Sequence, residues 1–287
     1  MTPAERIRRR SVAPGQVALY HLGQAGFCLK TSAGTLIHLD AYLSDCCHRL
    51  FGFKRMSPPP VTPNEPAPDL VASTHAHADH LDPEALPLFA RRPQTRFVGA
   101  PDCGPVYASA GIGPERTVLL EPGAATRVAD VELRAVDADH GDLAPEAIGL
   151  CVTTGGITVY HTGDTGYAPE RICPSLPGPV EVMIAPINGE FGNLNAEEAC
   201  RLAAQVRPRV LIACHFWMFV EHGGDPRSFL AAAPHLAPGV TAVVMAPGEE
   251  LLYSSADGIV GRWVPDRLAG TWQRTGAAGS GEPVADG

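Results

Sequence analysis

The chain has 287 residues, of which 45% are hydrophobic, and a formal net charge of −9 at pH 7. A chain of this size can bury one large hydrophobic core, and its acidic balance argues against binding to nucleic acid, which needs clustered Lys and Arg. No apolar run reaches the ~18–20 residues of a membrane span, and no apolar signal-peptide segment follows the N-terminal charges, so we expect a cytoplasmic protein with no membrane partner.

The first part of the chain predicts short strands joined by tight turns. Apolar runs bounded by Gly-containing turns indicate strands over 17–22, 26–31, 35–40 and 70–73. A proline-rich loop over 44–68 precedes the fourth strand, and loops of this length are commonly functional. Beyond that strand, Asp82 and Pro83 suit the N-cap and the first turn of a helix that should end near Ala90.

The rest of the chain predicts a mixture of strands and helices. The expected strands span 96–99, 116–120, 125–136, 147–154, 157–161, 179–185, 209–214, 240–245 and 250–253, and the expected helices span 104–110, 195–206 and 226–236. The pair Gly155-Gly156 is a strong hairpin signal, and Asn195 suits an N-cap. This order favours two packed sheets with helices outside, although it also fits other α/β layouts. We expect one domain over 1–269 and a flexible Gly-rich tail over 270–287.

Three histidines and an aspartate lie close together directly after the strand over 70–73. Side chains alternate along extended backbone, so His75 and His77 should point the same way. If the chain then turns into a helix, Asp79 and His80 project toward a neighbouring point. His and Asp are ligands of Zn²⁺ and Mn²⁺, so this segment predicts a metal centre that can serve two adjacent ions.

Three further residues that can bind metal, His140, Asp164 and His215, each follow a strand-like run. Strand ends are where a rigid scaffold presents ligands. Each residue also has an ordinary explanation when taken alone, because a lone His is commonly a hydrogen-bonded structural residue and an Asp beside Gly and Thr commonly forms a turn. Near His140, the alternative oxygen ligands are Asp137, Asp139 and Asp142.

Several segments resemble a known family. STHAHADHLD, YHTGDT and ACHFWMF are similar to the motifs of the metallo-β-lactamase superfamily. LDAYLSD, INGEFGNLNAEEA and the proline-rich loop resemble its L-ascorbate-6-phosphate lactonase-like branch, and the resemblance spans about residues 17–253. It implies an α/β fold of four layers, an αββα sandwich, with the metals at one edge between the sheets.

The resemblance also implies a role for each candidate ligand. His75, His77 and His140 would hold one divalent ion, Asp79, His80 and His215 would hold a second, and Asp164 would bridge the two. Asp40, at the end of an early strand, would orient the histidine loop without touching the metal. The implied cofactors are two divalent ions, Zn or Mn.

The function implied is that of a metallo-hydrolase, in which a hydroxide between the two ions attacks a lactone, in particular a phosphorylated or carboxylated sugar-type lactone. Asp79 and Asp164 are the predicted catalytic carboxylates. One alternative is a phosphodiesterase acting on cyclic nucleotides or similar phosphodiesters, because the same ions serve both reactions. Another is a non-catalytic binding protein that has kept the fold. The expected partner is an anionic small molecule; the sequence leaves the oligomeric state open, a homo-oligomer included.

Polar residues near the motifs are candidates for substrate binding. They are Tyr42, Arg55, Tyr167, Asn188, Trp217 and His222. Arg55 on the proline-rich loop suits a phosphate or a carboxylate, although a solvated loop charge explains it equally well.

Overall fold

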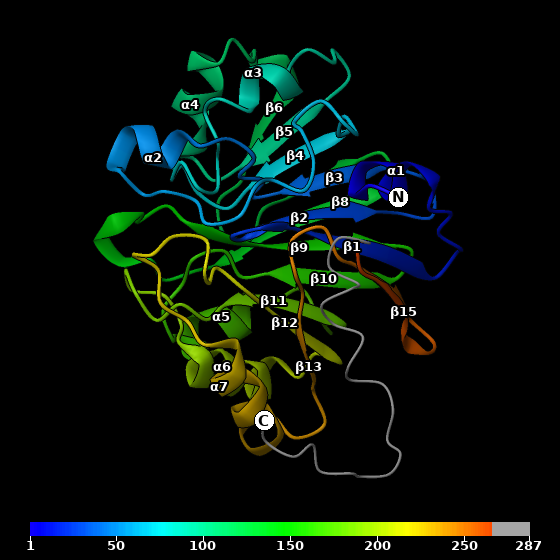
Figure 1. The fold of residues 1–287 in the computed structure, drawn as a ribbon, viewed down its shortest axis with the longest axis vertical. Coiled ribbons are helices and arrows are strands. Elements are labelled where there is room, and N and C mark those ends of the chain that lie inside the picture. The colour runs from blue at the N-terminus through cyan, green and yellow to red at the C-terminus, as the bar shows by residue number, and fades with distance from the viewer. Residues whose placement is uncertain (266–287) are drawn as a thin grey trace, which may run out of the picture.

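The computed structural model describes residues 1–265. Two β-sheets are stacked face to face, and helices cover their outer faces at the two ends of the molecule (Figure 1). The layers therefore run helix, sheet, sheet, helix, and the predicted αββα sandwich is confirmed. The predicted tail over 270–287 and the predicted end of the domain at residue 269 lie outside the described residues.

The first sheet combines the beginning and the end of the described chain. Its strands are β1 (Gln16–Gly23), β2 (Gly26–Lys30), β3 (Leu36–Leu39), β4 (Leu70–Ser73), β5 (Arg96–Gly99), β6 (Thr117–Leu119), β14 (Glu250–Ser254) and β15 (Gly258–Trp263). They lie in the order β15-β14-β1-β2-β3-β4-β5-β6. The strands from β3 to β6 are parallel, and the others are antiparallel to their neighbours.

The second sheet is built from the middle of the chain. Its strands are β7 (Ala125–Val128), β8 (Val131–Asp137), β9 (Ile148–Thr154), β10 (Ile157–His161), β11 (Val182–Pro186), β12 (Val210–Cys214) and β13 (Thr241–Val244). They follow the order β13-β12-β11-β10-β9-β8-β7. Strands β10 to β13 are parallel, and β8 runs in the same direction because β9 is antiparallel to both β8 and β10.

Seven α-helices occur within residues 1–265. They are α1 (Pro3–Arg9), α2 (Cys46–Phe51), α3 (Leu86–Phe89), α4 (Cys103–Ser109), α5 (Pro169–Ser175), α6 (Ala196–Val206) and α7 (Pro226–Leu236). Helices α3 and α4 lie against the first sheet, and α5, α6 and α7 pack on the second sheet (Figure 1). Strands β4, β11 and β12 are buried over their whole length, because both faces of each sheet are covered.

Some predicted elements differ from the structure. The strand predicted over 125–136 is a hairpin of β7 and β8, which turns at Ala129, a residue with φ of 52°. The helix predicted from Pro83 to Ala90 is regular only over Leu86–Phe89, although the Asp82 carboxylate accepts the Glu84 and Ala85 backbone N–H groups as a cap would. Helices α1, α2 and α5 and strand β15 were not among the predicted elements.

None of the described helices has the length and hydropathy that a membrane span requires.

His38 on β3 is a fully buried imidazole, and neither ring nitrogen forms a hydrogen bond within residues 1–265. Its ring lies edge-on to Phe89, with 5.4 Å between the centroids. Burial lowers the pKa of His38 to about 4. The unfolded chain therefore binds more protons than the folded chain between pH about 6.5 and 4, so stability falls as the pH falls through this window, by up to about 3 kcal/mol.

Replacing His38 by Leu is expected to remove this loss and to raise stability at pH 7 by about 1 kcal/mol, because the buried polar atoms that lack partners are gone. Urea unfolding of the wild type and His38→Leu at pH 7 and pH 5 measures both effects. An equal loss of stability on acidification in the two proteins would contradict the assignment.

Candidate metal centre

The candidate ligands converge because they follow the carboxyl ends of strands that run in the same direction. In the first sheet, Asp40 follows β3 and His75 lies just beyond β4. In the second sheet, His140, Asp164 and His215 lie beyond β8, β10 and β12. Parallel strands end at the same edge of a sheet, so side chains far apart in sequence meet at one edge of the sandwich.

Asp40 anchors the loop that carries the histidines. Its carboxylate accepts the Thr74 backbone N–H at 2.8 Å and the Thr74 hydroxyl at 2.7 Å. Since that hydroxyl proton is used, Thr74 Oγ1 accepts from His75 Nδ1 at 3.1 Å. His75 Nε2 is then an acceptor, and it is buried with no hydrogen-bond partner among residues 1–265.

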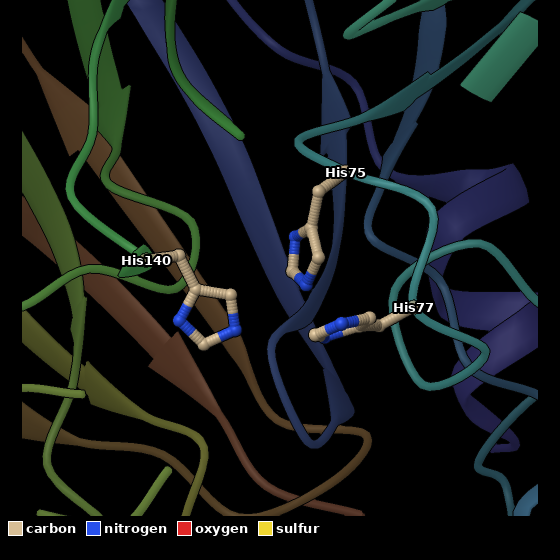
Figure 2. Close-up of side chains that lie close together, drawn as sticks. All are labelled: His75, His77 and His140. Atoms are coloured by element: carbon tan, nitrogen blue, oxygen red, sulfur yellow. The ribbon is translucent and has the colours of Figure 1, made fainter. Parts of the chain in front are cut away.

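His75, His77 and His140 form the first group of ligands. Figure 2 shows the three imidazoles facing a common space, two from the loop after β4 and one from the loop after β8. The His75 ring lies 4.4 Å from His77 and 5.2 Å from His140, centroid to centroid. His77 Nε2 lies 3.1 Å from the Leu143 carbonyl oxygen and donates to it, which leaves Nδ1 free to bind metal. One ligand atom from each residue lies within 4.8 Å of the others.

Asp79, His80 and His215 form the second group, under the same distance limit. His80 Nδ1 donates to Asp40 at 2.8 Å, so its Nε2 faces the centre. His215 Nε2 lies 3.3 Å from the nearest carboxylate oxygen of Asp79 and 3.3 Å from that of Asp164.

Asp164 contacts members of both groups. Its carboxylate lies 3.2 Å from His80 Nε2 and 3.8 Å from His140 Nε2. With His75 and His80 it also forms a third set of close ligand atoms. The position between the two groups is the one expected of a bridging carboxylate.

The charges of these groups fit a cation. Burial lowers the pKa of His75 and lowers that of His140 to about 4, so both imidazoles are neutral and can donate a lone pair. Burial raises the pKa of Asp164, but His215 and His80 together hold it well below its ordinary value. Burial lowers the pKa of His80, but nearby carboxylates, Asp164 foremost, raise it well above its ordinary value.

Asp79 and His215 show the same coupling. Burial raises the pKa of Asp79, but His80 and His215 bring it below its ordinary value. Burial lowers the pKa of His215, but Asp164 and Asp79 raise it to about 9.

Unpaired atoms at the centre also fit divalent ions. His75 Nε2, His80 Nε2 and Asp164 Oδ1 are buried and make no hydrogen bond in the described chain, although the last two atoms lie 3.2 Å apart. Leaving such an atom unsatisfied costs about 1–3 kcal/mol, and two divalent ions, one in each group, would together satisfy all three. The alternative ligands near His140 lie elsewhere: Asp139 lies 3.4 Å from Arg171, and neither Asp137 nor Asp142 belongs to a group of close ligand atoms within residues 1–265.

Two residues outside the predicted ligand set contact its carboxylates; Asn193 lies in the segment INGEFGNLNAEEA, whereas Gln24 lies outside the motifs found in the sequence. Asn193 donates to Asp164 Oδ2 at 2.9 Å. Gln24, on the turn between β1 and β2, donates from Nε2 to Asp79 Oδ2 at 2.8 Å. The same nitrogen lies 3.1 Å from His222 Nδ1 and 3.1 Å from His215 Nε2. Gln24 thus holds Asp79 of the second group, which, with His77 of the first, is one of the two candidate ligands that are partly exposed.

Replacing Gln24 by Met keeps the length of the side chain but removes the donor to Asp79. We expect the affinity for one of two ions to fall by about tenfold, because hydrogen bonds to ligands typically change metal affinity by 10–100-fold. Metal titration followed by calorimetry measures this. Gln205→Met, at an exposed position on α6, is the matched control; equal affinities in both variants would rule out the role of Gln24.

A cavity of about 620 Å³ opens above the ligands, and His77, Asp79, His140, Asp164 and His215 lie in its wall. Of the predicted substrate residues, only His222 lines this cavity. Tyr42 is buried, Asn188 is buried and donates to the Glu190 carbonyl, and Tyr167 and Trp217 are exposed outside it.

Arg55 also lies outside the cavity lining. Its guanidinium is buried, donates to the carbonyls of Ser44 and Ser57, and lies 4.8 Å from the centre of the Tyr42 ring.

Comparison with known proteins agrees with this geometry. A family model described as the beta-lactamase superfamily domain matches residues 35–216, a range that contains every candidate ligand. A metal-dependent hydrolase of Methanopyrus kandleri is 31% identical over 198 residues, covering 66% of this chain and 84% of that protein. A probable L-ascorbate-6-phosphate lactonase, UlaG, of Escherichia fergusonii is 24% identical over 268 residues, covering 78% of this chain and 76% of the relative.

Among solved structures, Igni18, a metallo hydrolase from Ignicoccus hospitalis, superposes with a TM-score of 0.67 at 22% identity, covering 83% of this chain and 99% of the other. The chain therefore belongs to the metallo-β-lactamase superfamily and is a metal-dependent hydrolase.

Proposed function

We propose that this hydrolase opens lactones at a centre of two divalent ions, Zn or Mn. The observation that carries the proposal is the convergence of seven ligand side chains into two groups joined by a carboxylate. His75, His77 and His140 would hold one ion, Asp79, His80 and His215 the other, and Asp164 both. Bound divalent ions supply Lewis-acid polarisation of a carbonyl and lower the pKa of coordinated water.

Two carboxylates beside the ions carry the charge that cation binding needs. Asp79 and Asp164 have lowered pKa values, so both stay ionised at neutral pH and can act as anionic ligands. Asp164 is oriented for this by Asn193.

His222 can donate a hydrogen bond into the cavity. Gln24 Nε2 carries two protons, and with one directed to Asp79 the other is available to His222 Nδ1 at 3.1 Å. Burial lowers the pKa of His222 to about 4, so the ring is neutral and its remaining proton sits on Nε2. We propose that this N–H contacts an oxygen of the substrate.

The lining favours a carbonyl substrate over a phosphodiester. No Lys or Arg within residues 1–265 lines the cavity, and phosphate recognition normally uses such side chains. The same feature counts against a phosphorylated sugar lactone.

The test compares γ-butyrolactone and δ-valerolactone with bis(p-nitrophenyl) phosphate, using protein loaded with Zn or Mn. We expect ring opening to exceed phosphodiester cleavage by a wide margin in kcat/KM. Faster cleavage of the phosphodiester would favour the phosphodiesterase, and no turnover of any ester or lactone by protein that holds both ions would favour a binding protein.

A further inference from the structure

The wall of the cavity above the metal ligands is apolar and comes from separate parts of the chain. Helix α2 and the residues after it, α4, the short 3₁₀ turn Gly141–Leu143, the loop after β11 and the loop after β12 all contribute. The large apolar side chains among them are Leu50, Phe51, Phe53, Val106, Leu143, Phe191 and Phe219. Together we call these residues the apolar wall.

Aromatic rings of the apolar wall pack on one another and on His222. Phe53 lies 6.2 Å from Phe191 and 5.9 Å from Phe219, centroid to centroid. The His222 ring lies 5.3 Å from Phe191 and 4.9 Å from Phe219. The proposed hydrogen-bond donor is thus set among phenyl rings, so that a group bound to it would also contact apolar surface.

Parts of the apolar wall are exposed to solvent, although exposure of apolar side chains to water is unfavourable. Phe51 is 63% exposed, Leu143 is 56% exposed and Phe191 is 44% exposed. Contiguous exposed apolar side chains on a folded protein commonly mark a binding site. Phe51, Leu143 and Phe191 border a concave cavity that ends at the metal ligands. This shape favours binding of a small molecule over binding of a flat surface of a partner protein.

Cations near the mouth of the cavity are already paired. Arg49 on α2 bonds Glu84, and Lys54 bonds Asp45. Arg55 is buried against the Ser44 and Ser57 carbonyls. None of these three side chains lines the cavity.

We propose that the substrate carries an apolar body, an alkyl or aryl group, on the lactone ring, and that the apolar wall binds this body. The proposal rests on the lactonase function and narrows it. Water adds across the ring C–O bond, so the acyl carbon gains the hydroxyl, the ring oxygen takes the proton, and the product is a hydroxy acid with an apolar tail. A cavity of about 620 Å³ lies within the range of small-molecule sites.

A series of uncharged γ-lactones that share one ring tests the proposal. With metal-loaded full-length protein, kcat/KM should rise by about threefold for each added methylene that becomes buried, and by about a hundredfold or more from γ-butyrolactone to γ-nonalactone. Equal kcat/KM across the series would overturn the apolar body while leaving the lactonase function standing.

Variants connect this selectivity to the apolar wall. Phe191→Ala and Leu143→Ala should each lower the ratio of kcat/KM for γ-nonalactone to that for γ-butyrolactone by about fivefold. Leu230→Ala on α7 is the matched control, because Leu230 is 47% exposed and lies outside the cavity lining. An unchanged ratio in both wall variants would overturn the proposal.

Binding of carboxylates that are not turned over distinguishes failure of the lactonase proposal from failure of the apolar-body proposal. Octanoate should bind the metal-loaded wild type more tightly than acetate, and Phe191→Ala should lose most of the difference. If no lactone is hydrolysed but this difference is found, the lactonase function fails and the apolar site stands. Two other outcomes would overturn the substrate proposal. One is a dimer of the wild type, detected by light scattering, that is lost in Phe191→Ala. The other is sedimentation of the wild type together with phosphatidylcholine vesicles.

Discussion

Replacing Asp164 by Asn is expected to lower kcat/KM by at least about 10³-fold and to remove one of two bound ions, because a bridging carboxylate loses its charge. Asp164 is the carboxylate that approaches both groups of ligands, at 3.2 Å from His80 Nε2 and 3.8 Å from His140 Nε2. An amide of the same size keeps the packing, so the loss reports on charge and ligation.

Asp139→Asn is the control, since Asp139 is a neighbouring acidic residue whose carboxylate pairs with Arg171 outside the ligand groups. Metal content after dialysis and steady-state kinetics are measured on both variants, with circular dichroism as the check on folding. Asp164→Asn protein that keeps two ions and activity within tenfold of the wild type would contradict the bridging role.

Replacing Asp40 by Ala is expected to affect folding and metal binding together. Asp40 is fully buried and accepts hydrogen bonds from the Thr74 N–H, the Thr74 hydroxyl and His80 Nδ1. Truncation leaves these buried donors unpaired, at about 1–3 kcal/mol each, so we expect a loss of about 3–5 kcal/mol in the free energy of unfolding. Metal affinity should fall by about 10–100-fold, because His80 is no longer held in the tautomer that binds metal.

Asp82→Ala separates these two effects. Asp82 is a buried carboxylate that accepts from the Leu43, Ser44 and Ala85 backbone N–H groups, none of which belongs to a candidate ligand. It should lose stability to a similar extent in urea unfolding and keep its metal affinity in a competition titration with a coloured chelator. If Asp82→Ala weakened metal binding as much as Asp40→Ala, the loss would reflect general destabilisation.

Local signals predicted much of the fold. Asn195 caps α6 through a capping box with Glu198, and Gly155-Gly156 forms the turn between β9 and β10 with positive φ at both glycines. Both depend on interactions within a few residues, so they can be read from short segments. Helix α2 has only six residues, and two of them, Leu50 and Phe51, expose apolar side chains at the cavity. These two apolar residues of α2 are therefore placed for the cavity and not for the core, so they show no amphipathic helical period in the sequence.

The candidate site was predictable where chemistry and position coincide. The segment from His75 to His80 is dense in ligands and follows a buried strand, so it could be recognised by itself. His140, Asp164 and His215 could be assigned to the same site only through the resemblance to a family. Gln24 reaches the site only through contacts to residues far along the chain, and a single Gln in a Gly-containing turn carries no signal of its own. For Arg55, the sequence showed a charge on a loop but not the Tyr42 ring and the carbonyls that bury it.

Anomalous diffraction from crystals of the metal-loaded protein tests the central claim most directly. The account predicts two peaks per chain. One should lie ~2.0–2.2 Å from nitrogens of His75, His77 and His140, the other at the same range from Asp79, His80 and His215, with Asp164 bonded to both. Peaks that lie away from these side chains, or protein that binds no divalent ion while fully folded, would contradict it.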